Sequence, residues 1–205
     1  MIELLGNLRR EMNGAVADSM YYSGKRYGLN YGVSIPTIRS IARNVQPDMS
    51  LAKYLLTQQV RELQLAALHI VPVEELTADD AIAIEKHVTN SELAEEAAFA
   101  LFGKCRVINE LCERWFASNN EYLCYCGLLA AAHNPAADLE AVVAQLCELV
   151  ARNDSSRYIA QGAIALLASL IHTAERHLVT TALEQMPETP TAQKIREEIE
   201  WQLEY

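Results

Sequence analysis

Residues 60–71 read Val-Arg-Glu-Leu-Gln-Leu-Ala-Ala-Leu-His-Ile-Val, and this stretch decides the fold. Apolar side chains at positions 60, 63, 67, 70 and 71 form one helical stripe, which Leu65, Ala66 and Leu68 widen over most of the circumference. A helix that is apolar almost all round has to be covered on several sides. We therefore expect this helix to lie inside a stack, with helices from earlier and later parts of the chain packed against it.

Similar apolar segments recur along the chain, and each follows an amphipathic one. The amphipathic segments cover residues 51–58, 79–88, 106–117 and 139–151. The apolar segments begin near residues 61, 92, 121 and 156, at spacings of 31, 29 and 35 residues. Helical hairpins that recur at this period are typical of an α-solenoid, in which each inner helix is covered by its partner and by both neighbouring repeats. The alternative is an irregular helical bundle, and the alternation of amphipathic and apolar segments argues against it.

No segment alternates between apolar and polar residues over a useful length, so no β-sheet is expected. The sequence therefore predicts an all-α protein, namely a right-handed α-solenoid of antiparallel helical hairpins of the HEAT-like or ARM type. At 205 residues, the chain is expected to form a single domain over residues 1–205.

Side chains that cap helices predict where most of the helices begin. Near the N-terminus we expect helices over 2–12 and 15–22, a glycine-rich loop over 23–32, and a third helix starting at Ile35 with Pro36 in its first turn. The predicted caps of the later helices are Ser50 for 51–58, Thr77 with Asp80 for 79–88, Ser91 for 92–104, Asp138 for 139–151, Ser155 or Asp154 for 157–171, Thr173 for 174–186 and Thr191 for the last helix.

The composition is that of an ordinary soluble globular protein, with 51% hydrophobic and 21% charged residues. No apolar run approaches the roughly 18 residues that a membrane span needs, and the first residues lack the pattern of a signal peptide. The five cysteines lie in helix-like segments, which favours reduced thiols in the cytoplasm. Neither a phosphate-binding nor a dinucleotide-binding glycine motif occurs, and no histidines or cysteines have metal-ligand spacing. We therefore expect no cofactor, no metal and no membrane partner.

The charge is unevenly distributed between the two ends of the chain. Residues 1–61 contain eight lysines or arginines and four carboxylates, a net charge of +4, whereas residues 62–205 contain nine and 23, a net charge of −14. The N-terminal part could therefore attract a polyanion that the remainder repels. The alternative is that the charged residues only solvate the exposed helix faces.

Four stretches of the sequence carry short motifs, namely residues 31–39 (Tyr-Gly-Val-Ser-Ile-Pro-Thr-Ile-Arg), 61–68 (Arg-Glu-Leu-Gln-Leu-Ala-Ala-Leu), 89–91 (Thr-Asn-Ser) and 115–123 (Trp-Phe-Ala-Ser-Asn-Asn-Glu-Tyr-Leu). Taken in this order, they resemble the AlkD-like family of DNA alkylation repair proteins. The resemblance implies a HEAT-like-repeat DNA glycosylase that excises N3- or N7-alkylated purines and grips double-stranded DNA in a groove. It also implies a site with two tryptophans, an aspartate that stabilises the cationic sugar, and an arginine for phosphate.

The chain departs from the family at each of those positions. The tryptophan and the aspartate four residues after it fall on Leu93 and Ala97, the arginine falls on Tyr125, and the second tryptophan falls on Ala165. A shift of one residue would place Glu96 near the position of the aspartate, but a glutamate in the first turns of a helix commonly serves only the helix dipole and solvent.

Three hypotheses about function follow from these observations. The first is a non-catalytic member of the family that binds DNA or another partner in its groove, with DNA contacts from Lys25, Arg26, Arg39, Arg43, Arg61, Lys104 and Arg106. The second is an active glycosylase with a rearranged site, in which Glu96 is the carboxylate and Tyr125 or Tyr122 the aromatic wall. The third is an α-solenoid that binds a protein, which the acidic C-terminal two thirds favour. The loss of the aspartate makes the expected absence of catalysis the leading interpretation.

Overall fold

The computed structural model describes residues 1–22 and 27–204, which form helices joined by short loops. The chain divides into two compact units, Met1–Leu101 and Phe102–Tyr205. Within the described residues no β-strand occurs, and one isolated parallel bridge joins Leu29 to Val60. The all-α prediction is confirmed. The sequence also predicted a single domain and a right-handed solenoid. Both depend on how the two units are joined, and both stay predictions.

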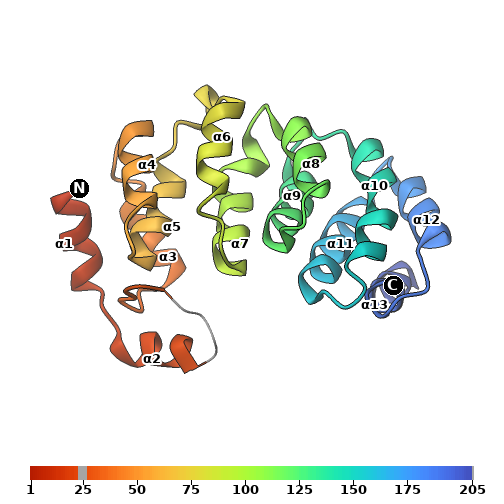
Figure 1. The fold of residues 1–205 in the computed structure, drawn as a ribbon, viewed down its shortest axis with the longest axis horizontal. Helices are drawn as coiled ribbons and strands as arrows, with labels where there is room; N and C mark the ends of the chain where they lie inside the picture. Colours follow the sequence, from red (N-terminus) through yellow and green to blue (C-terminus); the bar gives the residue numbers. More distant parts are fainter. Residues whose placement is uncertain (23–26, 205) are drawn as a thin grey trace. The chain divides into compact units, whose positions relative to one another are not determined.

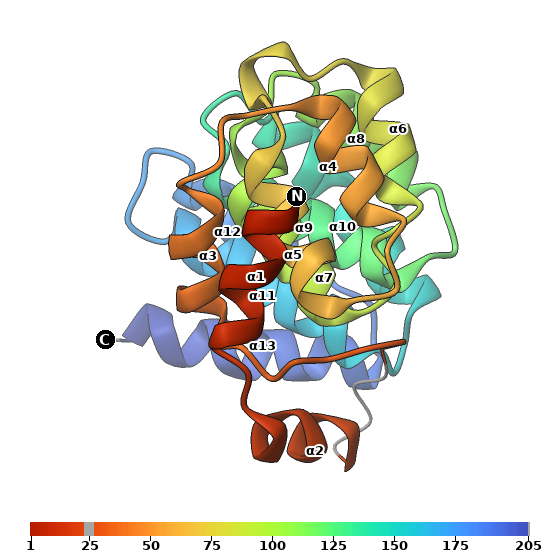
Figure 2. The same ribbon diagram turned by 90° about the vertical axis from the view of Figure 1, so that its left-hand side faces the viewer.

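The first unit contains seven α-helices within its described residues, arranged as an inner row and an outer row (Figure 1). They are α1 (Ile2–Arg10), α2 (Gly14–Tyr22), α3 (Ile35–Ala42), α4 (Met49–Leu56), α5 (Arg61–Ile70), α6 (Ala78–Glu85) and α7 (Ser91–Ala100), with a 3-10 turn at Val73–Glu75. Helix α5 packs against α3, α4 and α7, while α3 packs on α1 and α4 packs on α6. Helix α5, which contains most of the stretch 60–71, is therefore an inner helix covered on three sides. Helix α2 has no buried residue and lies apart from the other helices of its unit in two perpendicular views (Figure 2).

The second unit repeats this arrangement. Its elements are the 3-10 turn η2 (Phe102–Lys104) and the helices α8 (Ile108–Phe116), α9 (Glu121–His133), α10 (Leu139–Arg152), α11 (Arg157–Leu170), α12 (Arg176–Gln185) and α13 (Pro190–Glu204). Helix α11 packs between α9 and α13 in the inner row, and α10 packs between α8 and α12 in the outer row. The inner helices α5, α7, α9 and α11 begin at residues 61, 91, 121 and 157, which confirms the predicted repeat.

Close packing inside the second unit comes from aromatic side chains and one glycine. Trp115 and Phe102 are fully buried with their rings edge to face, 4.9 Å between centroids. A Cβ atom at Gly127 would lie 2.9 Å from the ring of Phe116, so glycine allows α8 and α9 to approach. The amide of Asn134, at the end of α9, donates to the carbonyls of Phe102 (3.0 Å) and Cys105 (2.8 Å) and joins η2 to the inner row.

Two of the predicted caps are confirmed. Thr77 and Asp80 form a reciprocal capping box at the start of α6, and the Asp138 carboxylate accepts from the Ala141 N–H at 3.0 Å at the start of α10.

The other predicted caps are wrong by one or two residues. The observed caps are Asp48 for α4, Asn90 for α7, Ser156 for α11 and Thr189 for α13, while α12 begins at Arg176 without a side-chain cap. At α4, α7, α11 and α13 the oxygen of a polar residue other than the predicted one accepts from a free N–H of the first turn, as Asp48 does from Leu51 at 2.9 Å. Helix α7 also ends earlier than predicted, because Leu101 leaves the helical conformation and η2 follows.

Over the described residues, no helix is both long and apolar enough to cross a bilayer. The five cysteines are all free thiols, four of them buried.

Candidate functional site

A buried ion-pair network joins α5 to α7 in the first unit. The Arg61 guanidinium donates to both carboxylate oxygens of Glu92 (2.8 and 2.7 Å), to Glu62 (2.9 Å) and to the carbonyl of Val33 (2.8 Å). Burial opposes the charge on Arg61, but the two carboxylates outweigh it and raise the pKa of this guanidinium. Arg61 is only 3% exposed. Its prediction as a DNA contact is therefore corrected, because its donors are used inside the unit and do not reach the surface.

The same network fixes the segment that precedes α3. The Glu62 carboxylate accepts from the N–H groups of Tyr31 (3.0 Å) and Val33 (3.3 Å). The Tyr27 hydroxyl donates to Glu92 at 2.6 Å, and burial together with this carboxylate raises the pKa of the phenol. The residues of the 31–39 and 61–68 motifs thus hold α3, α5 and α7 together.

A second cluster joins α3, α5 and α7 closer to the surface. Arg39 binds Glu96 through two bonds, Nε to Oε1 at 2.8 Å and a terminal nitrogen to Oε2 at 2.7 Å, and His69 also bonds to Oε1. Burial of Glu96 raises its pKa, but Arg39 and His69 outweigh this and lower the pKa to about 2. Both carboxylate oxygens are occupied and the residue is 2% exposed. This geometry is that of a clamp between helices, in which Glu96 would have to release a partner before it could bind water.

The exposed edge of α7 carries residues that the sequence reasoning did not single out. Leu93 and Ala97, which the sequence predicts to fall on the family's catalytic positions, are 1% and 0% exposed. Glu95 and Phe99 are the exposed residues of this helix, one turn apart, and the Arg39 guanidinium lies 4.0 Å above the centre of the Phe99 ring. The apolar pattern of the sequence could have predicted that Glu95 and Phe99 are exposed. The buried positions 93, 94, 97 and 98 form one side of the helix and leave positions 95 and 99 on the other.

Tyrosines gather on the inner helices of the second unit. Tyr125, at the position of the family's arginine, is buried, whereas Ala165 is half-buried. The ring of Tyr158 on α11 lies 5.6 Å from that of Tyr125 and 5.2 Å from that of Tyr122, both on α9. The Arg157 guanidinium lies 4.7 Å above the Tyr158 ring. Tyr122 and Tyr125 were predicted as a possible aromatic wall, but Tyr158 and Arg157 were missed because they lie more than 30 residues later.

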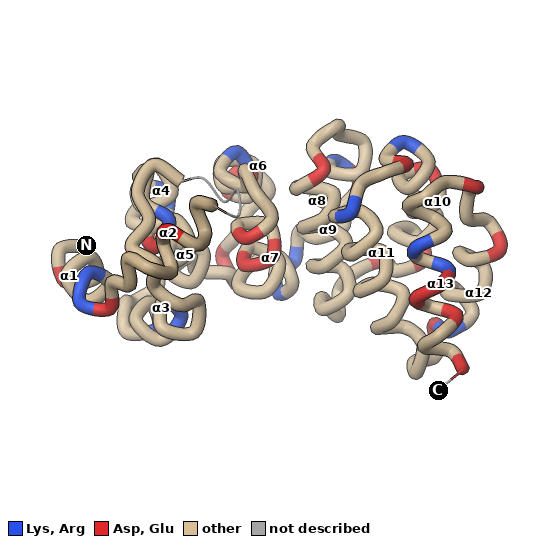
Figure 3. Tube along the Cα trace, turned by 90° about the horizontal axis from the view of Figure 1, so that it is seen from below, with Lys and Arg blue, Asp and Glu red and all other residues tan. Residues whose placement is uncertain are grey.

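The remaining predicted DNA contacts are divided between the two units. Arg39 is partly exposed beside its partner Glu96, and Arg43 is exposed at the end of α3. Lys104 and Arg106 are exposed at the start of the second unit. Lys25 and Arg26 lie outside the described residues. Acidic residues are interspersed with the basic ones along α10 to α13, so these helices do not present a continuous basic face (Figure 3).

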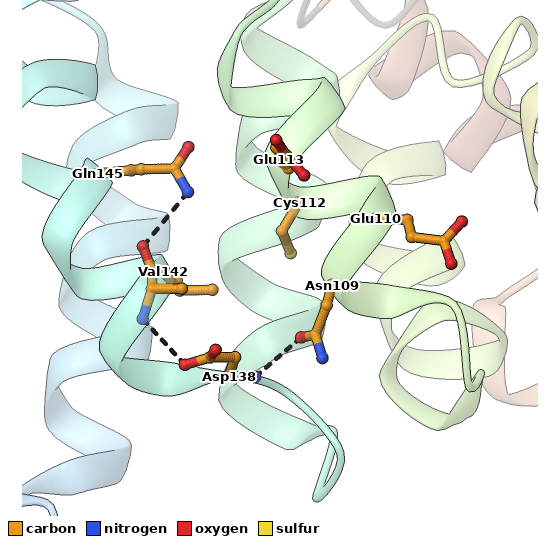
Figure 4. A pocket seen from close by; sticks show the side chains of 8 residues that line it. Asn109, Glu110, Cys112, Glu113, Asp138, Val142 and Gln145 are labelled. Atoms are coloured by element: carbon orange, nitrogen blue, oxygen red, sulfur yellow. Dashed lines mark hydrogen bonds between the residues drawn. The ribbon is translucent and has the colours of Figure 1, made fainter.

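A cavity of about 460 Å³ lies between the outer helices α8 and α10 (Figure 4). Its wall includes Glu110, Glu113 and Asp138, and the Asn109 side chain spans to the backbone N–H of Asp138 at 2.8 Å. Because these carboxylates would repel a phosphate, the cavity does not suit a polyanion. In the described part of the chain, no three histidine, cysteine or acidic side chains are grouped to hold a metal ion.

Comparison with known proteins gives a family. The sequence profile described as "DNA alkylation repair enzyme" matches residues 4–201. Among solved structures, one described as "A new family of proteins related to the HEAT-like repeat DNA glycosylases with affinity for branched DNA structures" is similar to this chain with a TM-score of 0.73. The match covers 97% of this chain and 93% of that one at 14% sequence identity, so it shows the HEAT-like fold alone. No curated protein matches the chain.

Proposed function

Because the chain belongs to the DNA alkylation repair enzyme family, we propose that it binds double-stranded DNA through cations of α3 and of the segment 104–106. The observation that carries the proposal is the family match over residues 4–201 on the HEAT-like fold. The solved neighbour is described as having affinity for branched DNA. Branched duplexes are therefore part of the proposed substrate.

In the first unit, α3 supplies the candidate phosphate contacts. Arg39 and Arg43 lie one turn apart, and the second of them is exposed. The Arg39–Glu96 bonds hold the first guanidinium against Phe99, so its position is fixed before DNA arrives. Lys104 and Arg106 are the corresponding candidates in the second unit. The five free thiols favour the cytoplasm as the location of the protein.

A salt titration tests the proposal. Each phosphate neutralised changes the slope of log K against log salt by about −0.9, so the two cations of either unit would give a slope of about −1.8. Binding of a labelled duplex and of a three-way junction would be followed by fluorescence anisotropy between about 50 and 200 mM salt. Arg43→Gln should reduce the slope by about 0.9. The matched control is Arg176→Gln, an exposed arginine on the outer helix α12, which should leave the slope unchanged.

Two results would contradict this proposal. One is the absence of binding to either DNA at low salt, and the other is binding that salt does not weaken. A defined protein that copurifies with the chain, without any retention of DNA, would instead support the third hypothesis, a protein-binding α-solenoid.

Excision of alkylated purines is the second candidate function, and one observation favours it. The exposed edge of α7 presents a carboxylate and an aromatic ring one turn apart, at Glu95 and Phe99. A cationic base could lie on the ring while the carboxylate stabilises the cationic sugar. Release of free N3-methyladenine or N7-methylguanine from alkylated DNA, lost in Glu95→Gln and kept in Glu96→Gln, would establish it. Loss only in Glu96→Gln would return the role to the carboxylate predicted from the sequence.

A further inference from the structure

We propose that the second unit holds an unpaired nucleotide, with its base stacked on Arg157 above Tyr158 and its phosphate in the pocket between α11 and α13. This inference rests on the proposed DNA binding and specifies which part of a branched DNA the second unit contacts.

The stacking surface is a column of three side chains that begins in the core. Tyr125 is buried at the bottom, and the Tyr158 ring is half-buried, 5.6 Å from the Tyr125 ring and tilted by 40°. Arg157 is exposed and covers Tyr158, with its guanidinium carbon 4.7 Å from the ring centre. A terminal nitrogen of Arg157 donates to the Tyr158 hydroxyl at 2.6 Å, which fixes the guanidinium in place. A planar, positioned guanidinium is a surface on which a nucleobase stacks.

A pocket of about 210 Å³ lies directly beside this column. Arg157 itself forms part of the wall, together with Ser155, Ser156, Ala160, Pro190, Thr191 and Lys194. One cation of the wall therefore comes from α11 and one from α13. A phosphate bound here would contact both cations, while the base attached to the same sugar reaches the exposed side of Arg157.

The local charge decides which interaction is larger. Two carboxylates lie near the pocket. Glu121 accepts from the Ser156 hydroxyl at 2.9 Å, and Asp154 accepts from the Ser155 hydroxyl at 3.1 Å. They balance the charges of Arg157 and Lys194, so phosphate attraction alone is weak at this site. Stacking must then supply most of the affinity. A base inside a duplex cannot stack on the protein because neighbouring bases already cover both of its faces, whereas an unpaired base can.

The experiment compares three labelled DNA probes by fluorescence anisotropy with the full chain. The first is a forked duplex with unpaired adenosine nucleotides in its arms. The second is the same fork with abasic sugar phosphates in the arms, and the third is a blunt duplex. The wild type should bind the first probe about 5- to 100-fold more tightly than the second, because one base stacks on the protein in the first and none can stack in the second.

Four variants assign the effect to the column. Tyr158→Leu removes the ring, and Arg157→Lys keeps the charge but removes the plane, so both should reduce binding of the first probe to the level of the second. Binding of the blunt duplex should not change. Tyr158→Phe keeps the ring and should retain most of the preference. The matched control Arg176→Lys, on the outer helix α12, should behave as the wild type.

Each outcome decides the matter. Equal affinity of the wild type for the two forks overturns the inference, even where duplex binding supports the proposed function. A preference that survives both Tyr158→Leu and Arg157→Lys also overturns it. If no probe binds, the proposed function itself fails. Should circular dichroism show that Tyr158→Leu does not fold, Arg157→Lys and the abasic probe still decide the result.

Discussion

Replacing Glu96 by glutamine should destabilise the protein at neutral pH, because this side chain is a buried anion held by Arg39 and His69. These partners lower its pKa from 4.5 to about 2. A difference of that size corresponds to about 3 kcal/mol of folding free energy. Because the pKa is lowered on folding, this stability is fully present above about pH 4.5 and is lost as the pH falls toward 2.

Urea unfolding followed by circular dichroism measures the effect. At pH 7, Glu96→Gln should unfold with about 3 kcal/mol less free energy than the wild type, and the two should converge between about pH 4.5 and pH 2. The matched control is Glu95→Gln, the exposed neighbour, which should stay within about 0.5 kcal/mol of the wild type. Both tryptophans, Trp115 and Trp201, lie in the second unit, so their fluorescence reports on that unit rather than on the clamp. Equal stability of Glu96→Gln and wild type at pH 7 would refute the clamp.

Three further substitutions test other parts of the structure. Arg61→Met should lower the free energy of unfolding by about 3–5 kcal/mol at pH 7, because it leaves Glu62 and Glu92 buried without their cation. DNA binding by the folded fraction should not change. A folded variant with a reduced salt slope would show that Arg61 contacts phosphate after all. Asp48→Ala should lower the free energy of unfolding by about 1 kcal/mol through the loss of the α4 cap, whereas Ser50→Ala should lower it much less. The reverse order in urea unfolding would support Ser50, the cap predicted from the sequence. Asn134→Ala should lower the free energy of unfolding by about 2–3 kcal/mol, because two buried carbonyls lose their donor. Thermal unfolding followed by tryptophan fluorescence should show a lower midpoint. An unchanged midpoint would count against the role of this amide.

The hairpin repeat could be predicted because the apolar pattern of each helix can be read from the residues of that helix alone. The stretch at 60–71 is apolar nearly all round, and α5 is indeed covered by α3, α4 and α7. The starts of the helices were harder, because polar residues often occur side by side. Asn90 precedes Ser91, and Asp154, Ser155 and Ser156 follow one another, so the sequence offers several caps at one helix end. Only backbone geometry selects the one whose oxygen meets the free N–H.

The partners of the charged residues could not be predicted, because they lie far apart in the chain. Arg39 and Glu96 are 57 residues apart, and Arg61 and Glu92 are 31 residues apart. Counted by segment, the two arginines belong to the N-terminal part with its net charge of +4 and the glutamates to the acidic remainder. In the folded unit they neutralise one another. The apparent basic region is therefore smaller at the surface than in the sequence.

This internal use of arginine limits how the protein can bind DNA. Of the five predicted contacts within the described residues, Arg61 is buried and Arg39 is bound to Glu96, whereas Arg43, Lys104 and Arg106 are exposed. Few phosphate contacts give a duplex modest affinity and a shallow salt dependence. Planar side chains such as Phe99 and Arg157, which are both exposed, gain most where a base is accessible. Stacking on these side chains where base pairing is interrupted would therefore add affinity that the three exposed residues among the five predicted phosphate contacts do not supply.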